Sequence, residues 1–189
     1  MTDWTRYYAA TGEDPRDTLL DAVGRFETPG LAVDLGCGTG RDTFELLRRG
    51  WRVLAIDATP QAIERLRERV TDDERLETEV SAMEDAVWPA CELVNASFSL
   101  PFCPPARFDE LWKRISDSLR GGGRFCGQLF GDRDGWAPAD DITFHTRDEA
   151  AALLREFDVE RFDEVEEDST TALGEPKHWH VFHVVARRR

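Results

Sequence analysis

The chain has 189 residues, a length that fits one domain and allows folding without disulfides or a structural metal. Apolar residues make up 41% and aromatic residues 10% of the chain, which excludes a largely disordered protein. The net charge of −14 repels phosphate backbones and anionic lipids, so the composition argues against nucleic-acid and membrane partners.

The first half of the chain alternates short apolar runs with helical patterns. Leu31–Leu35 is an apolar run that leads into a glycine-rich loop, as a buried parallel strand does. A helix is predicted over Arg41–Arg49, because Gly50 is the residue type that commonly follows a helix C-terminus. Residues 51–56 are predicted as a second strand, and Thr59-Pro60 begins the next helix.

The second half continues this alternation. Further strands are predicted at 77–81, 92–96, 124–130 and 177–186. An amphipathic helix is indicated by apolar residues at helical spacing, namely Phe108, Leu111, Trp112, Ile115 and Leu119. We expect this helix to end at the glycine run 121–123. Another helix is predicted at 148–156. In the segment 158–167 the apolar residues match neither helical spacing nor the alternation of a strand. The alternation predicts an α/β sheet with helices on both faces and a ligand site at the carboxyl ends of the central strands.

The most informative segment is the loop after the first predicted strand, Val33-Asp34-Leu35-Gly36-Cys37-Gly38-Thr39-Gly40-Arg41-Asp42. Its three glycines permit a tight turn and close approach of the backbone to a ligand, and the helix that follows offers unpaired N–H groups. A dinucleotide fingerprint would need glycine at position 41, where this chain has Arg41, and a P-loop would need Gly-Lys-Ser/Thr. The loop therefore indicates a ligand with an adenosine and a carboxylate but no phosphates.

The second informative residue is Asp57, which ends the second predicted strand about 20 residues after Asp34. A carboxylate there can accept hydrogen bonds from both hydroxyls of a ribose. Taken alone, Asp57 would be interpreted as a helix cap. Its position after the glycine loop favours ribose binding.

Together these residues resemble the class I S-adenosylmethionine (SAM)-dependent methyltransferases. The resemblance rests on Val33–Gly40 and on Leu54–Asp57, and it extends through the turn Leu119–Phe125, so it covers roughly residues 30–130. It implies a Rossmann-like, seven-stranded sheet whose last strand is antiparallel and lies between strands five and six. It also implies that SAM is the cofactor.

The resemblance places cofactor contacts along the carboxyl ends of the strands. Gly36 and Gly38 are expected to face the methionine part of SAM, with Asp34 supporting the loop. Asp57 matches the ribose-binding acid of the family, and Ala58 is expected to pack beside the adenine.

The residue expected to bind the adenine amino group departs from the family pattern in this sequence. Ala82 replaces the family's usual acid, so Glu84 is the expected substitute and the Met83 backbone the expected partner of a ring nitrogen. Asn95 ends the fourth predicted strand, where it either faces the transferring methyl group or caps the strand. The predicted cofactor-binding residues are Arg16, Asp34, Gly36, Cys37, Gly38, Gly40, Asp57, Ala58, Met83, Glu84 and Asn95.

Residues 1–28 are predicted as a helical lid on a SAM-binding core of residues 29–189, in one methyltransferase domain. The stretches Trp4–Tyr8 and Asp14–Arg16 resemble small bacterial members of the family, the tellurite-resistance-type and thiopurine-type methyltransferases. The resemblance implies that Arg16 reaches the carboxylate of SAM and that Tyr8 covers the cofactor. The alternative is that these aromatic residues pack on the core.

Two further sets of residues have a functional and a structural interpretation. Phe98 and Phe102 are predicted, with Tyr8, to line a substrate pocket, although they equally fit a loop packed on the core. On the last predicted strand, His178 and His180 share one face and His183 lies on the other, so strand packing is favoured over a metal site. The acidic stretch 160–168 is expected to be a solvated edge.

The sequence predicts a SAM-dependent methyltransferase that methylates a small molecule by in-line displacement, and it identifies no catalytic base. A non-enzymatic SAM-binding protein of the same fold remains an alternative, as does a nucleotide-dependent oxidoreductase, which Arg41 disfavours. The four cysteines are widely spaced, and neither a signal peptide nor a membrane-spanning run is visible. We therefore expect a cytoplasmic protein with a small-molecule acceptor and no metal, membrane or nucleic-acid partner.

Overall fold

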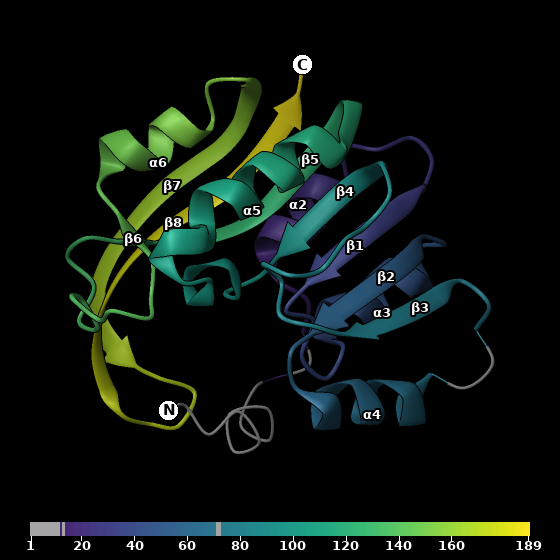
Figure 1. Cartoon of the computed structure of the whole chain (residues 1–189), viewed down its shortest axis with the longest axis horizontal. Coiled ribbons are helices and arrows are strands. Elements are labelled where there is room, and N and C mark those ends of the chain that lie inside the picture. The colour runs from purple at the N-terminus through teal and green to yellow at the C-terminus, as the bar shows by residue number, and fades with distance from the viewer. Residues whose placement is uncertain (1–11, 13, 71–72) are drawn as a thin grey trace.

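One mixed β-sheet organises the part of the chain that the computed structural model describes, which is residues 12, 14–70 and 73–189 (Figure 1). Its strands are β1 Leu31–Leu35, β2 Arg52–Asp57, β3 Leu76–Val80, β4 Cys91–Ala96, β5 Leu119–Gly131, β6 Phe144–His145, β7 Phe157–Thr170 and β8 Pro176–Arg188. The helices are α2 Asp17–Val23, α3 Arg41–Arg48, α4 Pro60–Arg69, α5 Pro105–Ser118 and α6 Arg147–Leu153, with a 3₁₀ turn at Leu100–Phe102. The predicted aromatic cover Trp4–Tyr8 lies outside the described residues.

The strand order is β3-β2-β1-β4-β5-β8-β7, and the two-residue β6 pairs with the end of β5. Strands β1 to β5 are parallel, whereas β8 runs antiparallel to both β5 and β7. The predicted Rossmann-like sheet, with an antiparallel last strand between the fifth and sixth long strands, is therefore confirmed. The short β6 adds one strand to the seven that were expected.

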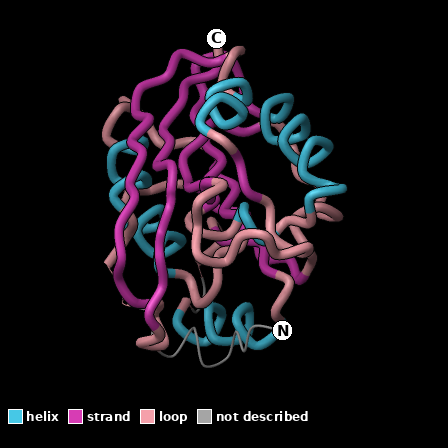
Figure 2. Tube along the Cα trace, turned by 90° about the vertical axis from the view of Figure 1, so that its left-hand side faces the viewer, coloured by secondary structure: helices cyan, strands magenta, loops and turns pink. Residues whose placement is uncertain are grey.

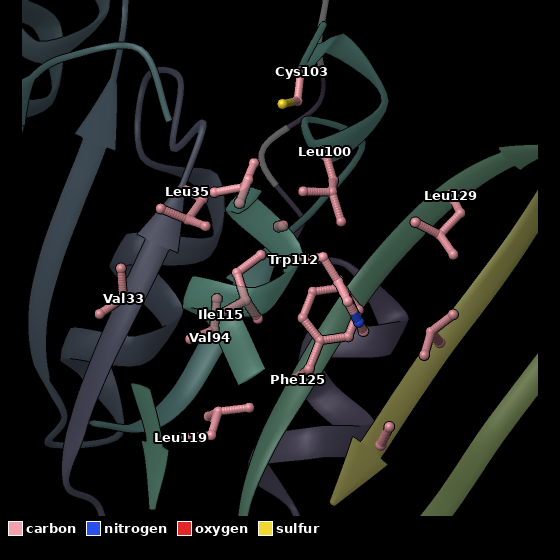
Figure 3. Packing of buried hydrophobic residues seen from close by; sticks show 14 of the residues in the cluster. Val33, Leu35, Val94, Leu100, Cys103, Trp112, Ile115, Leu119, Phe125 and Leu129 are labelled. Atoms are coloured by element: carbon pink, nitrogen blue, oxygen red, sulfur yellow. The ribbon is translucent and has the colours of Figure 1, made fainter. Parts of the chain in front are cut away.

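Helices cover both faces of the sheet, as Figure 2 shows from the side of the long β7–β8 hairpin. Residues of α2, α3 and α4 pack in one buried cluster, and residues of α5 and α6 pack in another. In the second cluster the ring of Trp112 meets that of Phe125 edge-on at 4.9 Å, between α5 and β5 (Figure 3). Burial of each such side chain stabilises the fold by about 1.5–3 kcal/mol, so the two clusters hold the strand ends in fixed positions.

The fifth strand begins earlier than the sequence pattern predicts. Helix α5 ends at Ser118, and β5 already begins at Leu119, so the glycine run 121–123 belongs to the strand and does not precede it. A Cβ at Gly123 would lie 2.9 Å from the carbonyl oxygen of Glu92, so this stretch of β5 approaches β4 more closely than a side chain permits. The pairing of the two strands shifts register at the same point.

The segment 158–167, whose apolar residues match neither helix nor strand spacing, belongs to strand β7 at one edge of the sheet. Its mostly exposed acidic side chains bind arginines instead of packing against a helix. Arg133 lies 2.7 Å from Glu166 and 3.0 Å from Glu164, and Arg147 lies 2.6 Å from Glu164. An edge strand held by ion pairs needs no apolar alternation, which explains why the pattern is weak.

The histidines of β8 are divided between the two faces of the hairpin. His178 and His180 bond to carboxylates of β7, with His178 Nδ1 2.8 Å from Asp168 and His180 Nε2 2.9 Å from Glu164. His183 instead contacts Gln128 of β5. Within residues 12, 14–70 and 73–189, no group of three or more His, Cys, Asp or Glu side chains is placed to hold a metal ion. No helix in the same residues is long and apolar enough to cross a membrane.

We expect Gly131→Ala to destabilise the protein by about 1–3 kcal/mol, because a buried methyl group would be forced into an occupied site. A Cβ at position 131 would lie 1.9 Å from Nδ1 of His180, which is fully buried. Gly121→Ala in the same strand is the matched control, since no atom lies within 4 Å of its Cβ position. Urea unfolding of both variants measures the difference, and equal midpoints would contradict the steric argument.

Candidate functional site

The glycine loop lies at the carboxyl end of β1 and leads directly into α3, as the sequence predicts. Gly36 has φ +68° and Gly40 has φ +97°, in the left-handed region that favours glycine. A Cβ at Gly36 would also lie 2.3 Å from Cβ of Ser99, so no larger residue fits there. The loop is fixed to the neighbouring strand because the N–H groups of Gly36 and Cys37 both donate to the Ile56 carbonyl.

Asp57 ends β2 and is almost completely buried beside this loop. Its Oδ2 accepts a hydrogen bond from the N–H of Gly38 at 2.8 Å, and its Oδ1 accepts one from the N–H of Thr59 at 2.8 Å. Thr59 is the N-cap residue of α4. The carboxylate therefore joins the glycine loop to the start of α4, a role within the protein that accompanies its predicted role toward a ribose.

A buried polar network lies beneath the loop and connects β1, β4 and α3. Asp34 accepts hydrogen bonds from the Thr43 hydroxyl at 2.6 Å and from the Asn95 amide at 2.9 Å. The same amide nitrogen donates to Asp42 at 3.0 Å. The second oxygen of Asp42 accepts the backbone N–H of Arg16 at 3.0 Å, so the network also positions the start of α2.

The pKa of Asp34 is raised to about 7 in this buried site. Burial is the main cause, since it disfavours the charged form, and the nearby carboxylate of Asp42 adds to the effect. Hydrogen bonds from Thr43 and Asn95 act in the opposite direction. Burial also raises the pKa of the Cys37 thiol well above its usual value, which is the reverse of what a nucleophilic cysteine needs.

Asn95 is fully buried, and its side chain is bonded on all sides within the protein. Its amide nitrogen donates to Asp34 and Asp42, and its Oδ1 accepts from the Ser97 hydroxyl at 3.1 Å. The Cys126 thiol lies 3.2 Å from the same oxygen. Of the two interpretations that the sequence left open, the structural one accounts for all of these bonds, and contact with a methyl group stays a prediction.

The predicted adenine-side residues lie at the carboxyl ends of β2 and β3. These two ends are joined by the Ser81 N–H, which donates to the Asp57 carbonyl at 3.1 Å. Ala58 is exposed, whereas Met83 and Glu84 are half-buried. Met83 packs against the apolar cluster beneath the sheet. The structure therefore brings these residues to the same edge as Asp57, and their contacts with adenine remain predictions.

Arg16 and Phe98 come together on the other side of the loop. The Arg16 guanidinium lies 4.5 Å from the centre of the Phe98 ring, and both residues line a cavity of about 540 Å³. Phe102 packs on Phe130 and Trp136, with ring centres 6.0 and 6.3 Å away, and does not line this cavity. Tyr8, the third predicted pocket residue, lies outside the described part of the chain.

Sequence reasoning missed three residues of this cavity, namely Gln128 of β5, Arg161 of β7 and His183 of β8. Burial lowers the pKa of His183, the neighbouring Arg161 and Arg16 lower it further, and Asp163 and Asp17 act in the opposite direction, so the net effect favours the neutral ring. The one sequence feature that bears on these cavity residues is the alternation of side chains along β8, which puts His183 on the face opposite to His178 and His180. This alternation does not show which face of β8 borders a cavity.

The sequence of this chain is similar to those of known methyltransferase domains. The methyltransferase domain family matches residues 32–123. A probable cobalt-precorrin-6B C(15)-methyltransferase (decarboxylating) from Methanothermobacter thermautotrophicus is 37% identical over 95 residues, which are 50% of this chain and 49% of that protein. A carboxy-S-adenosyl-L-methionine synthase from Yersinia enterocolitica is 35% identical over 109 residues, covering 52% of this chain and 40% of the synthase. The chain thus matches half or less of the length of these relatives.

Solved structures share the fold over most of the chain. TehB from Haemophilus influenzae has a TM-score of 0.78 at 17% identity, covering 92% of this chain and 62% of TehB. The 1,6-didemethyltoxoflavin-N1-methyltransferase of Burkholderia thailandensis, solved with 1,6-didemethyltoxoflavin and S-adenosylhomocysteine, has a TM-score of 0.71 at 24% identity. That alignment covers 98% of this chain and 80% of the Burkholderia enzyme. At these identities the likeness is one of fold.

We expect Asp34 to make the protein less stable as the pH rises from about 4 to about 7. Its pKa is near 3.8 in an unfolded chain and about 7 in the folded one, so the folded state holds the extra proton across this window. Asp34→Asn removes the ionisation, and its amide can still pair with Thr43 and Asn95. Thermal melts from pH 4 to pH 7 should show the native chain losing stability relative to the variant. A difference in melting temperature between the two proteins that stays constant from pH 4 to pH 7 would contradict the raised pKa of Asp34.

Proposed function

We propose that this chain, which carries a methyltransferase domain on the class I fold, is a SAM-dependent enzyme that methylates a small molecule. One observation carries the proposal. The glycine loop, the acid at the end of β2 and the N-terminus of α3 meet at one edge of the sheet, where parallel sheets bind ligands. The family match and the shared fold support the same conclusion.

The residues present fit the proposed cofactor. Gly36 and Gly40 are held in left-handed conformations with Ser99 and Leu66 packed against them, which fixes the tight turn of the loop at the strand end. Asp57 is an acceptor at the strand end, the position from which a ribose is bound. Arg16 lies at the start of α2 as a cation for the methionine carboxylate. When bound, SAM supplies a methyl group on a positively charged sulfur, which needs no further activation.

The contribution of the protein to such a reaction is mainly positioning. Methyl transfer is an in-line displacement, so holding the acceptor atom in line with the methyl group supplies most of the rate enhancement. The cavity beside Phe98 lies next to the proposed cofactor site, because Arg41 of α3 and Arg16 belong to its wall. Its volume of about 540 Å³ is typical of small-molecule sites.

The same cavity favours an enzyme over a non-enzymatic SAM-binding protein. In such a protein the acceptor pocket would be filled, whereas here a cavity borders Phe98, three residues after the strand-end Asn95. An oxidoreductase is disfavoured because Arg41, the first residue of α3, stands where a dinucleotide site requires its third glycine.

We expect the purified protein to bind SAM and S-adenosylhomocysteine and not to bind NADH, because the loop has no third glycine at position 41. Calorimetry with the three ligands tests this directly. Binding of NADH together with no heat from SAM would overturn the proposed function.

We expect Asp57→Asn to lower SAM affinity about 10- to 100-fold. Two ribose hydroxyls would lose a charged acceptor, at about 1.5–3 kcal/mol each before non-additivity. The variant keeps one amide oxygen for Gly38 or Thr59, so its loss of stability should be smaller than that of Asp57→Ala. Calorimetry and thermal melts on both variants separate the two roles. Unchanged affinity with a lower melting temperature would leave Asp57 as a structural clamp only.

A further inference from the structure

The cavity beside Phe98 gathers arginine side chains within a protein of negative net charge. The chain has a net charge of −14, yet the cavity is lined by Arg16, Arg41 and Arg161 against Asp14 and Asp17. Both of these acids are exposed at the rim. Asp163 pairs with Arg161 at 2.7 Å and balances part of this charge, but three guanidinium groups in one concave site still attract anions more than the surrounding acidic surface does.

Gln128, which lines the cavity, determines which nitrogen of His183 accepts a hydrogen bond. Its side chain is almost fully buried, and its Oε1 accepts the backbone N–H of Phe98 at 2.8 Å. The other end of the amide is therefore the nitrogen, which donates to the Thr18 hydroxyl at 3.0 Å and lies 3.4 Å from Nδ1 of His183. An amide nitrogen only donates, so Nδ1 of His183 is the acceptor.

This contact determines what His183 offers to a ligand. A neutral imidazole carries its proton on one nitrogen, and Nδ1 is used as an acceptor, so the proton is on Nε2. His183 is therefore a hydrogen-bond donor in the cavity and not a base. Arg161 also offers donors, because its bond to Asp163 at 2.7 Å uses the Nε–H, one of the five N–H groups of the guanidinium.

Phe98 forms the wall between these donors and the glycine loop. It has φ +52°, in the left-handed region that is strained for a bulky residue and that clusters at functional sites. Its ring is held edge-on by His183 at 6.0 Å and by Trp179 at 6.2 Å. The next residue, Ser99, packs against Gly36 of the loop. The strained backbone thus directs one residue to the proposed cofactor side and its neighbour to the cavity.

We propose that the cavity binds the carboxylate of an organic-acid methyl acceptor, with the Arg161 guanidinium and the Nε2–H of His183 as donors and the Phe98 ring as a flat wall. The acceptor is then a small organic acid that presents its nucleophilic atom toward the cofactor side of Phe98. This assignment rests on the proposed function, since it names the substrate class of the same site.

Benzoate is a suitable probe, because its flat ring and carboxylate match the wall and the donors. Benzamide has the same shape without the charge, and benzylamine reverses the charge. Calorimetry is run with each probe, on the protein alone and on protein saturated with S-adenosylhomocysteine. We expect benzoate to bind in both cases, at least about tenfold more tightly than benzamide, as a charge-assisted hydrogen bond implies.

Arg161→Gln should reduce benzoate affinity about tenfold or more and abolish the preference over benzamide. Arg161→Lys, which keeps the charge, should retain part of that preference. The matched control is Lys113→Gln on α5, which changes the net charge equally and removes only an exposed ion pair with Asp117. It should bind benzoate as the native chain does, and all three variants should bind S-adenosylhomocysteine normally.

Several results would overturn the assignment. These are no benzoate binding, equal binding of benzamide, tighter binding of benzylamine, or an Arg161→Gln variant with unchanged benzoate affinity. Loss of benzoate on saturation with S-adenosylhomocysteine would also overturn it, because the carboxylate would then occupy the cofactor site. If S-adenosylhomocysteine fails to bind while benzoate binding still depends on Arg161, the proposed function fails and the acid-binding cavity stands.

Discussion

The hydrogen bond from the Gly38 N–H to the Asp57 carboxylate is the contact on which the site depends. It ties a loop that follows β1 to the end of β2, and the second oxygen of the same carboxylate holds the start of α4. The Gly36 and Cys37 N–H groups, which donate to the Ile56 carbonyl, tie the start of the loop to the same strand. One buried acid therefore sets the shape of the backbone at the strand ends.

A second set of buried carboxylates supports the loop from below. Asn95 lies between Asp34 and Asp42, two acids that would repel each other if both were charged, and donates to both. The raised pKa of Asp34 is the expected consequence of crowding acids in a dry site. Because Asp42 also holds the backbone of Arg16, the network couples the core to the segment at the cavity rim.

Much of the architecture could be predicted because its signals are local. The glycine loop, the acid at the end of β2 and the apolar face of α5 are each contained in one short stretch of sequence. The cavity could not be predicted in this way, because Gln128, Arg161 and His183 come from three strands whose neighbours are set by the β5-β8-β7 order. The start of β5 was misplaced for a related reason, since Gly123 is required by the close approach of β4.

The edge position of β7 affects how the molecule meets its own copies. One side of this long strand pairs with β8, and its other side has no neighbouring strand among the residues that the structure describes. Open backbone groups on such an edge can template pairing with a second chain. Here the strand carries Glu160, Asp163, Glu164, Glu166, Glu167 and Asp168, and charged side chains of this kind disfavour such pairing at the edges of natural sheets. The charged side chains that make β7 hard to recognise as a strand are therefore also unfavourable for the merging of two sheets into one.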